Sequence, residues 1–200
     1  MMKKLTSITL TNLLFVSFLF VSCQKAVDEN LFEALPASKT GINFINRIED
    51  KKELNVFNYR NFYNGGGVAI GDVNNDGWAD IYVTSNFEKN HLYLNKGKNK
   101  TDLWKFDDVT LPAGVGGTKA WSTGATFADV NGDGLMDIYV CNAGNIQGDS
   151  RGNELFINQG IGSDGIPKFL DKATEYGLAD GGYSTHAAFF DYDRDGDLDM

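Results

Sequence analysis

The sequence contains few cysteines, few histidines and no cluster of positively charged residues. Only two cysteines and two histidines occur among 200 residues, and so few cysteines argue against a disulfide-built scaffold. Lys and Arg number 18 against 27 Asp and Glu, for a formal net charge of −9. Nucleic-acid binding is disfavoured, because neutralising phosphates requires clustered Lys and Arg, and no such cluster occurs. The chain is nevertheless 42% hydrophobic, which is enough for a packed core.

The N-terminus carries no ordinary membrane span. The apolar stretch Leu13–Val21 is too short, because a spanning helix needs about 20 apolar residues. Two lysines precede it, so residues 1–22 have the pattern of an export signal. The stretch runs from Phe20 into Cys23 and resembles a bacterial lipobox, which implies a diacylglycerol on Cys23 and cleavage before it. We expect an extracytoplasmic protein, lipid-anchored at the bacterial outer membrane or cell surface. The alternative is a plain signal peptide with an incidental cysteine.

The rest of the chain divides into a tether and a folded body. Residues 23–40 have mixed charge and no sustained periodicity, as expected of a tether, and we place the folded region at 41–200. Acylation of Cys23 leaves Cys141 without an intrachain partner. Because Cys141 follows the apolar run Asp137–Val140, a buried strand thiol is expected.

An internal repeat is the strongest signal in the sequence. A nine-residue acidic segment occurs at Asp72–Asp80, at Asp129–Asp137 and at Asp191–Asp199, with offsets of 57 and 62 residues. Other features keep a similar step, since Asn90–Asn95 matches Asn153–Asn158. The whole unit therefore repeats, and not only one loop.

Apolar residues alternate within each unit, as Ile81 and Val83 do around Tyr82. This period of two predicts strands, and about four short runs per unit predict a four-stranded blade of an all-β propeller. A β-sandwich is the alternative, which the tandem repeat disfavours. Propellers close with about four to eight blades, whereas this chain supplies roughly two and a half, so we expect the N-terminal part of a longer protein. The segment Gly41–Phe44 is also predicted to be a strand, because Ile42 and Phe44 alternate with polar residues.

The acidic segments share the pattern D-x-[DN]-x-D-G-x-x-D and hold 11 of the 27 acidic residues. Oxygen donors at this density suit a hard cation, and the absence of His and Cys argues against zinc or copper. An EF-hand would need a bidentate Glu at its twelfth position, where Val83 and Val140 stand. We therefore predict Ca²⁺ held by strand-to-strand turns. The predicted ligands, with the seventh residue contributing its main-chain carbonyl, are Asp72, Asn74, Asp76, Trp78 and Asp80; Asp129, Asn131, Asp133, Leu135 and Asp137; and Asp191, Asp193, Asp195, Asp197 and Asp199.

From about residue 40 onward the units resemble FG-GAP/VCBS repeats, which occur in integrin α-subunit propellers and in bacterial surface proteins. The segments Tyr63–Asp72, Leu92–Asn95 and Gly177–Asp180 are more specifically similar to secreted lipoproteins of the ASPIC/UnbV class, related to cartilage acidic protein. The resemblance implies further blades and a C-terminal domain beyond this sequence.

No catalytic pattern occurs. Gly65–Ile70 breaks a dinucleotide-binding motif at Ile70, and Ser163 lacks the flanking glycines of a nucleophile elbow. His91 and His186 lie at non-equivalent places in their repeats and are expected to be structural. We therefore expect a scaffold that binds a protein or glycan ligand, with no catalytic residues. The alternatives are the non-catalytic propeller of a larger secreted enzyme, of glycan lyase or hydrolase type, and a structural spacer in the cell envelope.

Overall fold

A computed structural model describes residues 31–98, 104–144 and 151–200. The export signal and Cys23 lie outside the described residues, so both stay predictions. Residues Leu35–Met200 form one compact unit. None of the helices within the described residues is long and apolar enough to span a membrane.

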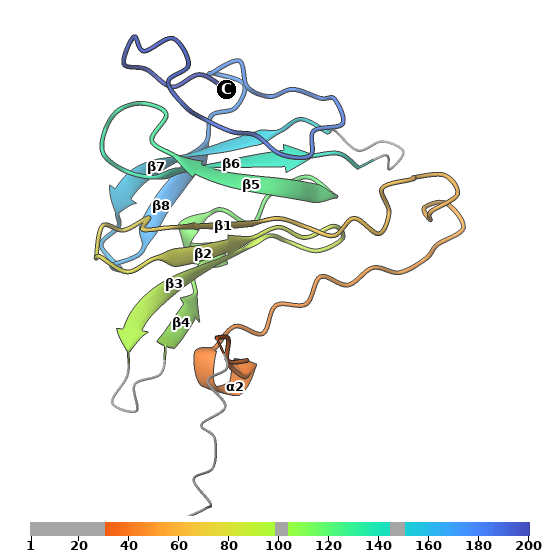
Figure 1. The fold of residues 1–200 in the computed structure, drawn as a ribbon, viewed down its shortest axis with the longest axis horizontal. Helices are drawn as coiled ribbons and strands as arrows, with labels where there is room; N and C mark the ends of the chain where they lie inside the picture. Colours follow the sequence, from red (N-terminus) through yellow and green to blue (C-terminus); the bar gives the residue numbers. More distant parts are fainter. Residues whose placement is uncertain (1–30, 99–103, 145–150) are drawn as a thin grey trace, which may run out of the picture. The chain divides into compact units, whose positions relative to one another are not determined.

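The compact unit is built from two four-stranded antiparallel sheets (Figure 1). The first has the order β1-β2-β3-β4, with β1 at Val68–Gly71, β2 at Asp80–Val83, β3 at His91–Lys98 and β4 at Trp104–Asp108. The second has the order β5-β6-β7-β8, with β5 at Ser122–Ala128, β6 at Asp137–Asn142, β7 at Glu154–Ile161 and β8 at Pro167–Asp171. Two four-residue helices accompany them, α2 at Ala37–Thr40 and α3 at Thr110–Ala113. The prediction of all-β, four-stranded blades is confirmed.

The two sheets pack face to face through alternating residues of their strands, but in β2 the residue in this core is Tyr82 and not its apolar neighbours Ile81 and Val83. Tyr82, Leu92 and Leu94 lie on one face of the first sheet and are completely buried. They share a core with Ile138 and Val140 of the second sheet, which are equally buried. Each such side chain contributes about 1.5–3 kcal/mol through removal from water. Cys141 lies in β6 and is buried, as predicted.

The first strands of consecutive units lie side by side. The Thr84 hydroxyl, just after β2, donates to the Thr123 carbonyl of β5 at 3.0 Å. The hydroxyls of Thr123 and Thr126 in turn donate to the carbonyls of Ser184 and Ala187, at 2.8 and 2.7 Å. The start of the third unit therefore lies against β5. Within the described residues its strand pairing consists of an isolated bridge between Phe190 and Asp199.

The prediction of a strand at Gly41–Phe44 was wrong. The structure assigns neither strand nor helix there. Ile42 and Phe44 are half-buried between exposed neighbours, so the burial alternates as in a strand. No described segment forms a ladder with them, and the segment instead covers the first sheet through side chains. The Phe44 ring, for example, lies 5.4 Å from the ring of His91.

Candidate metal centre

The first acidic loop joins β1 to β2 and is closed by its own carboxylates. Asp72 accepts hydrogen bonds from the amides of Asp76 and Gly77, at 3.1 and 2.7 Å. Asn74 accepts from the Asp76 amide at 3.2 Å, and Asp76 accepts from the Trp78 amide at 2.9 Å. Side-chain oxygens at the first, third and fifth positions therefore all turn toward the inside of the loop.

The second loop repeats this pattern residue by residue. Asp129 accepts from the amides of Asp133 and Gly134, at 3.1 and 2.8 Å. Asn131 accepts from the Asp133 amide at 3.0 Å, and Asp133 accepts from the Leu135 amide at 2.9 Å. Two loops of different sequence thus adopt one hydrogen-bonded geometry, which shows that the polar positions define the turn.

Two positions in each loop adopt the left-handed backbone conformation. The sixth-position glycines have φ between 83 and 100°, which explains the invariant Gly in the pattern. The fourth position is also left-handed, in Asn75, Gly132 and Arg194, with φ of 56, 73 and 66°. Sequence reasoning missed this requirement. Asn and Gly tolerate the conformation, and their occurrence at that position was the available signal.

The ninth residue ties each loop to the next strand. Asp80 is fully buried, and its two carboxylate oxygens accept from the amides of Val73 and Asn95, at 3.0 and 2.8 Å. Asp137 is equally buried and accepts the equivalent two amides at 3.0 and 2.8 Å. The Asn95 side chain also donates to the carbonyl of Ala79, at 2.9 Å. Asn95 is therefore part of the loop's support, which sequence reasoning did not assign.

The buried carboxylates carry an electrostatic cost. Burial raises the pKa of Asp80 to about 6, the amides of Asn95 and Val73 lower it in part, and repulsion from Asp76 and Asp72 raises it further. Burial raises the pKa of Asp137 as well. No Lys or Arg in the described parts of the chain forms an ion pair with a loop carboxylate. A cation in the loop would offset both the burial and the repulsion.

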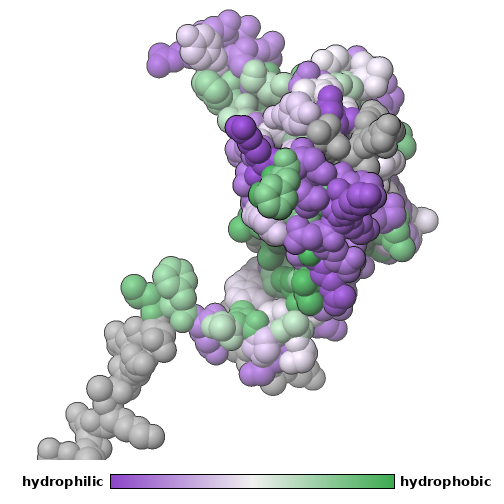
Figure 2. Space-filling model, turned by 90° about the vertical axis from the view of Figure 1, so that its right-hand side faces the viewer, coloured by the Kyte–Doolittle hydropathy of each residue, from purple (hydrophilic) through white to green (hydrophobic). Residues whose placement is uncertain are grey.

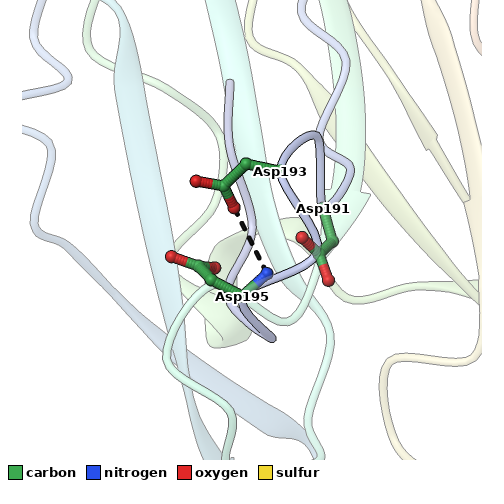
Figure 3. A group of neighbouring side chains, drawn as sticks. All are labelled: Asp191, Asp193 and Asp195. Atoms are coloured by element: carbon green, nitrogen blue, oxygen red, sulfur yellow. Dashed lines mark hydrogen bonds between the residues drawn. The ribbon is translucent and has the colours of Figure 1, made fainter.

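The third loop brings its carboxylates closest together (Figure 3). Oxygens of Asp191, Asp193 and Asp195 lie within 4.8 Å of one another, and the three side chains are exposed. The Asp195 amide donates to Asp193 at 3.2 Å, and the ninth residue, Asp199, accepts from the Tyr192 amide at 2.8 Å. Within the described residues this is the one group of three carboxylates so close together.

A family model described as an FG-GAP-like repeat matches residues 72–140, from the first acidic loop through most of β6. The chain contains FG-GAP-like repeats. Cartilage acidic protein 1 of Xenopus tropicalis is 31% identical over 137 residues, which make up 68% of this chain and 19% of that protein. The chain therefore spans about a fifth of the length of the curated relative it matches.

The seventh position of each acidic loop was predicted to contribute a main-chain carbonyl. The amides of Trp78, Leu135 and Asp197 all donate to the fifth-position carboxylate of their loop, at 2.9 to 3.1 Å. This orients the seventh residue in the same way three times. Metal contact by its carbonyl stays a prediction, as do the other ligands.

The first FG-GAP repeat also contains a histidine–carboxylate pair that sequence reasoning did not find. His91 Nδ1 lies 2.7 Å from Asp108 Oδ2, and the His91 ring stacks on Tyr93, with centroids 5.9 Å apart. The Thr110 amide and hydroxyl donate to the other oxygen of Asp108, at 3.0 and 2.5 Å. Burial acts to raise the pKa of Asp108, but the hydrogen bonds from Thr110 and His91 outweigh it and lower the pKa.

The equivalent carboxylate of the second repeat, Asp171, has a turn role. It accepts from the amides of Leu155 and Ala173, at 3.2 and 3.0 Å. Glu154 stands where the first repeat has His91, and it is fully buried, accepting from Thr118 instead. The histidine pair is thus specific to the first repeat, whereas the turn role of the carboxylate is common to both.

Proposed function

We propose that this chain belongs to a lipid-anchored, extracytoplasmic, calcium-binding β-propeller that acts as a protein- or glycan-binding scaffold at the cell envelope. The observation that carries the calcium part is the position of Asp80 and Asp137. Both carboxylates are fully buried beside further loop carboxylates, and no described cationic side chain pairs with them. Buried carboxylates with raised pKa values at the same position of two loops mark a candidate functional site.

The chemistry of the loops favours calcium among the possible cations. Their side chains offer carboxylate and amide oxygens, with neither His nor Cys in any loop. Calcium accepts six to eight oxygen ligands in a flexible geometry, at about 2.3–2.6 Å, whereas magnesium requires a tighter octahedron. The loop oxygens that already accept amide hydrogen bonds retain lone pairs for a metal. Metal in these turns would stabilise the fold and would take no part in catalysis.

The test of calcium binding is the melting temperature of the full chain in calcium and in chelator. A site filled to about ten times its Kd adds about 1.4 kcal/mol to the free energy of unfolding, so calcium should raise the melting temperature by several degrees. Asp133→Ala should reduce this gain, while Glu175→Ala should leave it unchanged, because Glu175 is an exposed carboxylate that pairs with Lys172 outside the loops. Equal melting curves with and without calcium would contradict the proposal.

The lipid anchor requires its own experiment. Cys23→Ser should abolish the mobility shift of the acylated protein and its partitioning into detergent. Unchanged partitioning of the variant would exclude an anchor on Cys23.

The scaffold role is tested by glycan-array and pull-down binding of the full-length protein. We expect the protein to bind a ligand without converting it. Turnover of a bound glycan would instead support the larger-enzyme alternative.

A further inference from the structure

A polar pocket of about 250 Å³ lies where the first strands of the three units begin. Tyr59, Asn61 and Asn64 line it from the segment before β1, and Thr123 lines it from β5. His186 completes it from the third unit. The acidic loops follow the same strands, so the pocket lies at the opposite end from them. Figure 2 shows the face of the molecule at this end, on which hydrophilic side chains predominate.

Equivalent residues of the three repeats meet at this pocket. Gly67, Gly124 and His186 each stand five residues before the first Asp of an acidic loop. A Cβ atom on Gly67 would lie 2.8 Å from the Gly124 Cα atom, and one on Gly124 would lie 2.5 Å from the Thr185 carbonyl oxygen. The first two repeats therefore require glycine, because neighbouring backbones approach closely.

The third repeat has His186 at this position, where the first two repeats have glycine. The Nδ1 atom of His186 would lie 3.0 Å from a Cβ atom on Gly124, so the ring lies over the glycine backbone at the pocket. The side chains of His186, Asn64 and Thr185 are exposed at the pocket and form no hydrogen bond within the described residues, so they are open to a ligand. The imidazole of His186, which can both donate and accept a hydrogen bond, thus occupies the position equivalent to Gly67 and Gly124. Of the three positions, it is the one where the backbone leaves room for a side chain.

The pocket lining is uncharged and combines polar side chains with glycine backbone and Tyr59. Two amides, the Thr185 hydroxyl and the His186 imidazole surround it, and no Asp, Glu, Lys or Arg is among its lining residues. The hydroxyl of Tyr59, a further lining residue, is buried and interacts with the side chain of Asn61. A charged ligand would find no opposite charge here.

We propose that this pocket binds one neutral sugar residue of a glycan. Adjacent hydroxyls of a sugar both donate and accept hydrogen bonds, which matches amides, hydroxyls and an imidazole. The volume falls just below the roughly 300–1,000 Å³ of pockets for drug-sized ligands, which fits a single ring. The inference rests on the glycan-binding branch of the proposed function.

The test is ligand-observed saturation-transfer NMR on the full chain in calcium. The probes are glucose, galactose, mannose and N-acetylglucosamine, each at millimolar concentrations because a ligand this small binds weakly. At least one is expected to bind. His186→Gly restores the residue of the other two repeats, so it should fold normally and weaken binding about tenfold, the effect of one lost hydrogen bond. His91→Ala, on β3, is the matched control and should bind as the wild type does.

Two outcomes would overturn the proposal: saturation transfer from none of the four sugars, or equal binding by wild type and His186→Gly. Calcium-dependent melting distinguishes the two claims. Sugar binding that depends on His186 in a protein whose melting ignores calcium would refute the calcium sites alone. Calcium-dependent melting without sugar binding would refute the pocket alone.

Discussion

The buried carboxyl of Asp80 makes the stability of the metal-free protein depend on pH. Its pKa is about 6 in the folded state, against an ordinary value of 3.8. Because the folded state holds this proton more tightly, the group's stabilising contribution is complete below about pH 4 and is lost as the pH rises through about 6. A shift of two pKa units is worth about 3 kcal/mol, so ionised Asp80 should cost about that much at pH 7, roughly half of it already by pH 5.

Calcium should reverse this trend, because the metal requires the ionised carboxylate. The assay is urea denaturation at pH 5, 6 and 7, with protein passed over a chelating resin and with calcium restored. The reference variant is Asp80→Asn, which cannot ionise. It leaves one of the amides of Val73 and Asn95 without an acceptor, at a constant cost of about 1–3 kcal/mol.

Without metal, the wild type should lose about 1 kcal/mol more than Asp80→Asn between pH 5 and pH 7. With calcium, the wild type should no longer show this loss. Parallel pH profiles of the two proteins in both conditions would refute the reasoning, because they would show that Asp80 is ionised in the folded state without cost.

Three further outcomes follow from particular positions. Gly134→Ala should lower the free energy of unfolding in urea by about 1–2 kcal/mol, since the residue has φ of 83° and a Cβ would contact nothing. Gly67→Ala should cost more, about 3 kcal/mol, because a Cβ there lies 2.8 Å from backbone atoms of Thr123 and Gly124; equal losses in the two variants would contradict this contrast. Burial raises the pKa of Cys141 to about 11, so its thiol should react with a disulfide reagent at pH 8 only after unfolding, and rapid labelling of the native protein would show that it is accessible.

The strands and the acidic loops were predictable because their signals are local. A period of two marks strands such as β2 and β6, and the spacing of the carboxylates within nine residues defines a turn wherever it occurs. The two loops accordingly have the same hydrogen bonds although only some of their residues agree. Because the sequence repeats, the strands and the acidic loop predicted for one unit are also predicted for the next.

The features that were missed depend on contacts between distant segments. His91 meets Asp108 only because β3 and β4 pair in a register that aligns Tyr93 with Asp108. The segment Gly41–Phe44 has the alternation of a strand, but a strand also needs a partner for its backbone, which alternation does not supply. The position of His186 at the pocket depends on the fold, because it requires the equivalent segments of the three repeats to lie side by side. Gly67 and Gly124 allow their backbones to approach that closely.

Calcium titration of the full chain by isothermal calorimetry tests the central claim most directly. The account predicts saturable binding at the three acidic loops, with Kd values of about 10⁻⁴–10⁻³ M, and much weaker binding of magnesium. Asp76→Ala and Asp133→Ala should each remove one site, and the double variant should remove both. An absence of calcium binding, or a stoichiometry unchanged in the double variant, would show that these loops are turns held by their own hydrogen bonds and not metal sites.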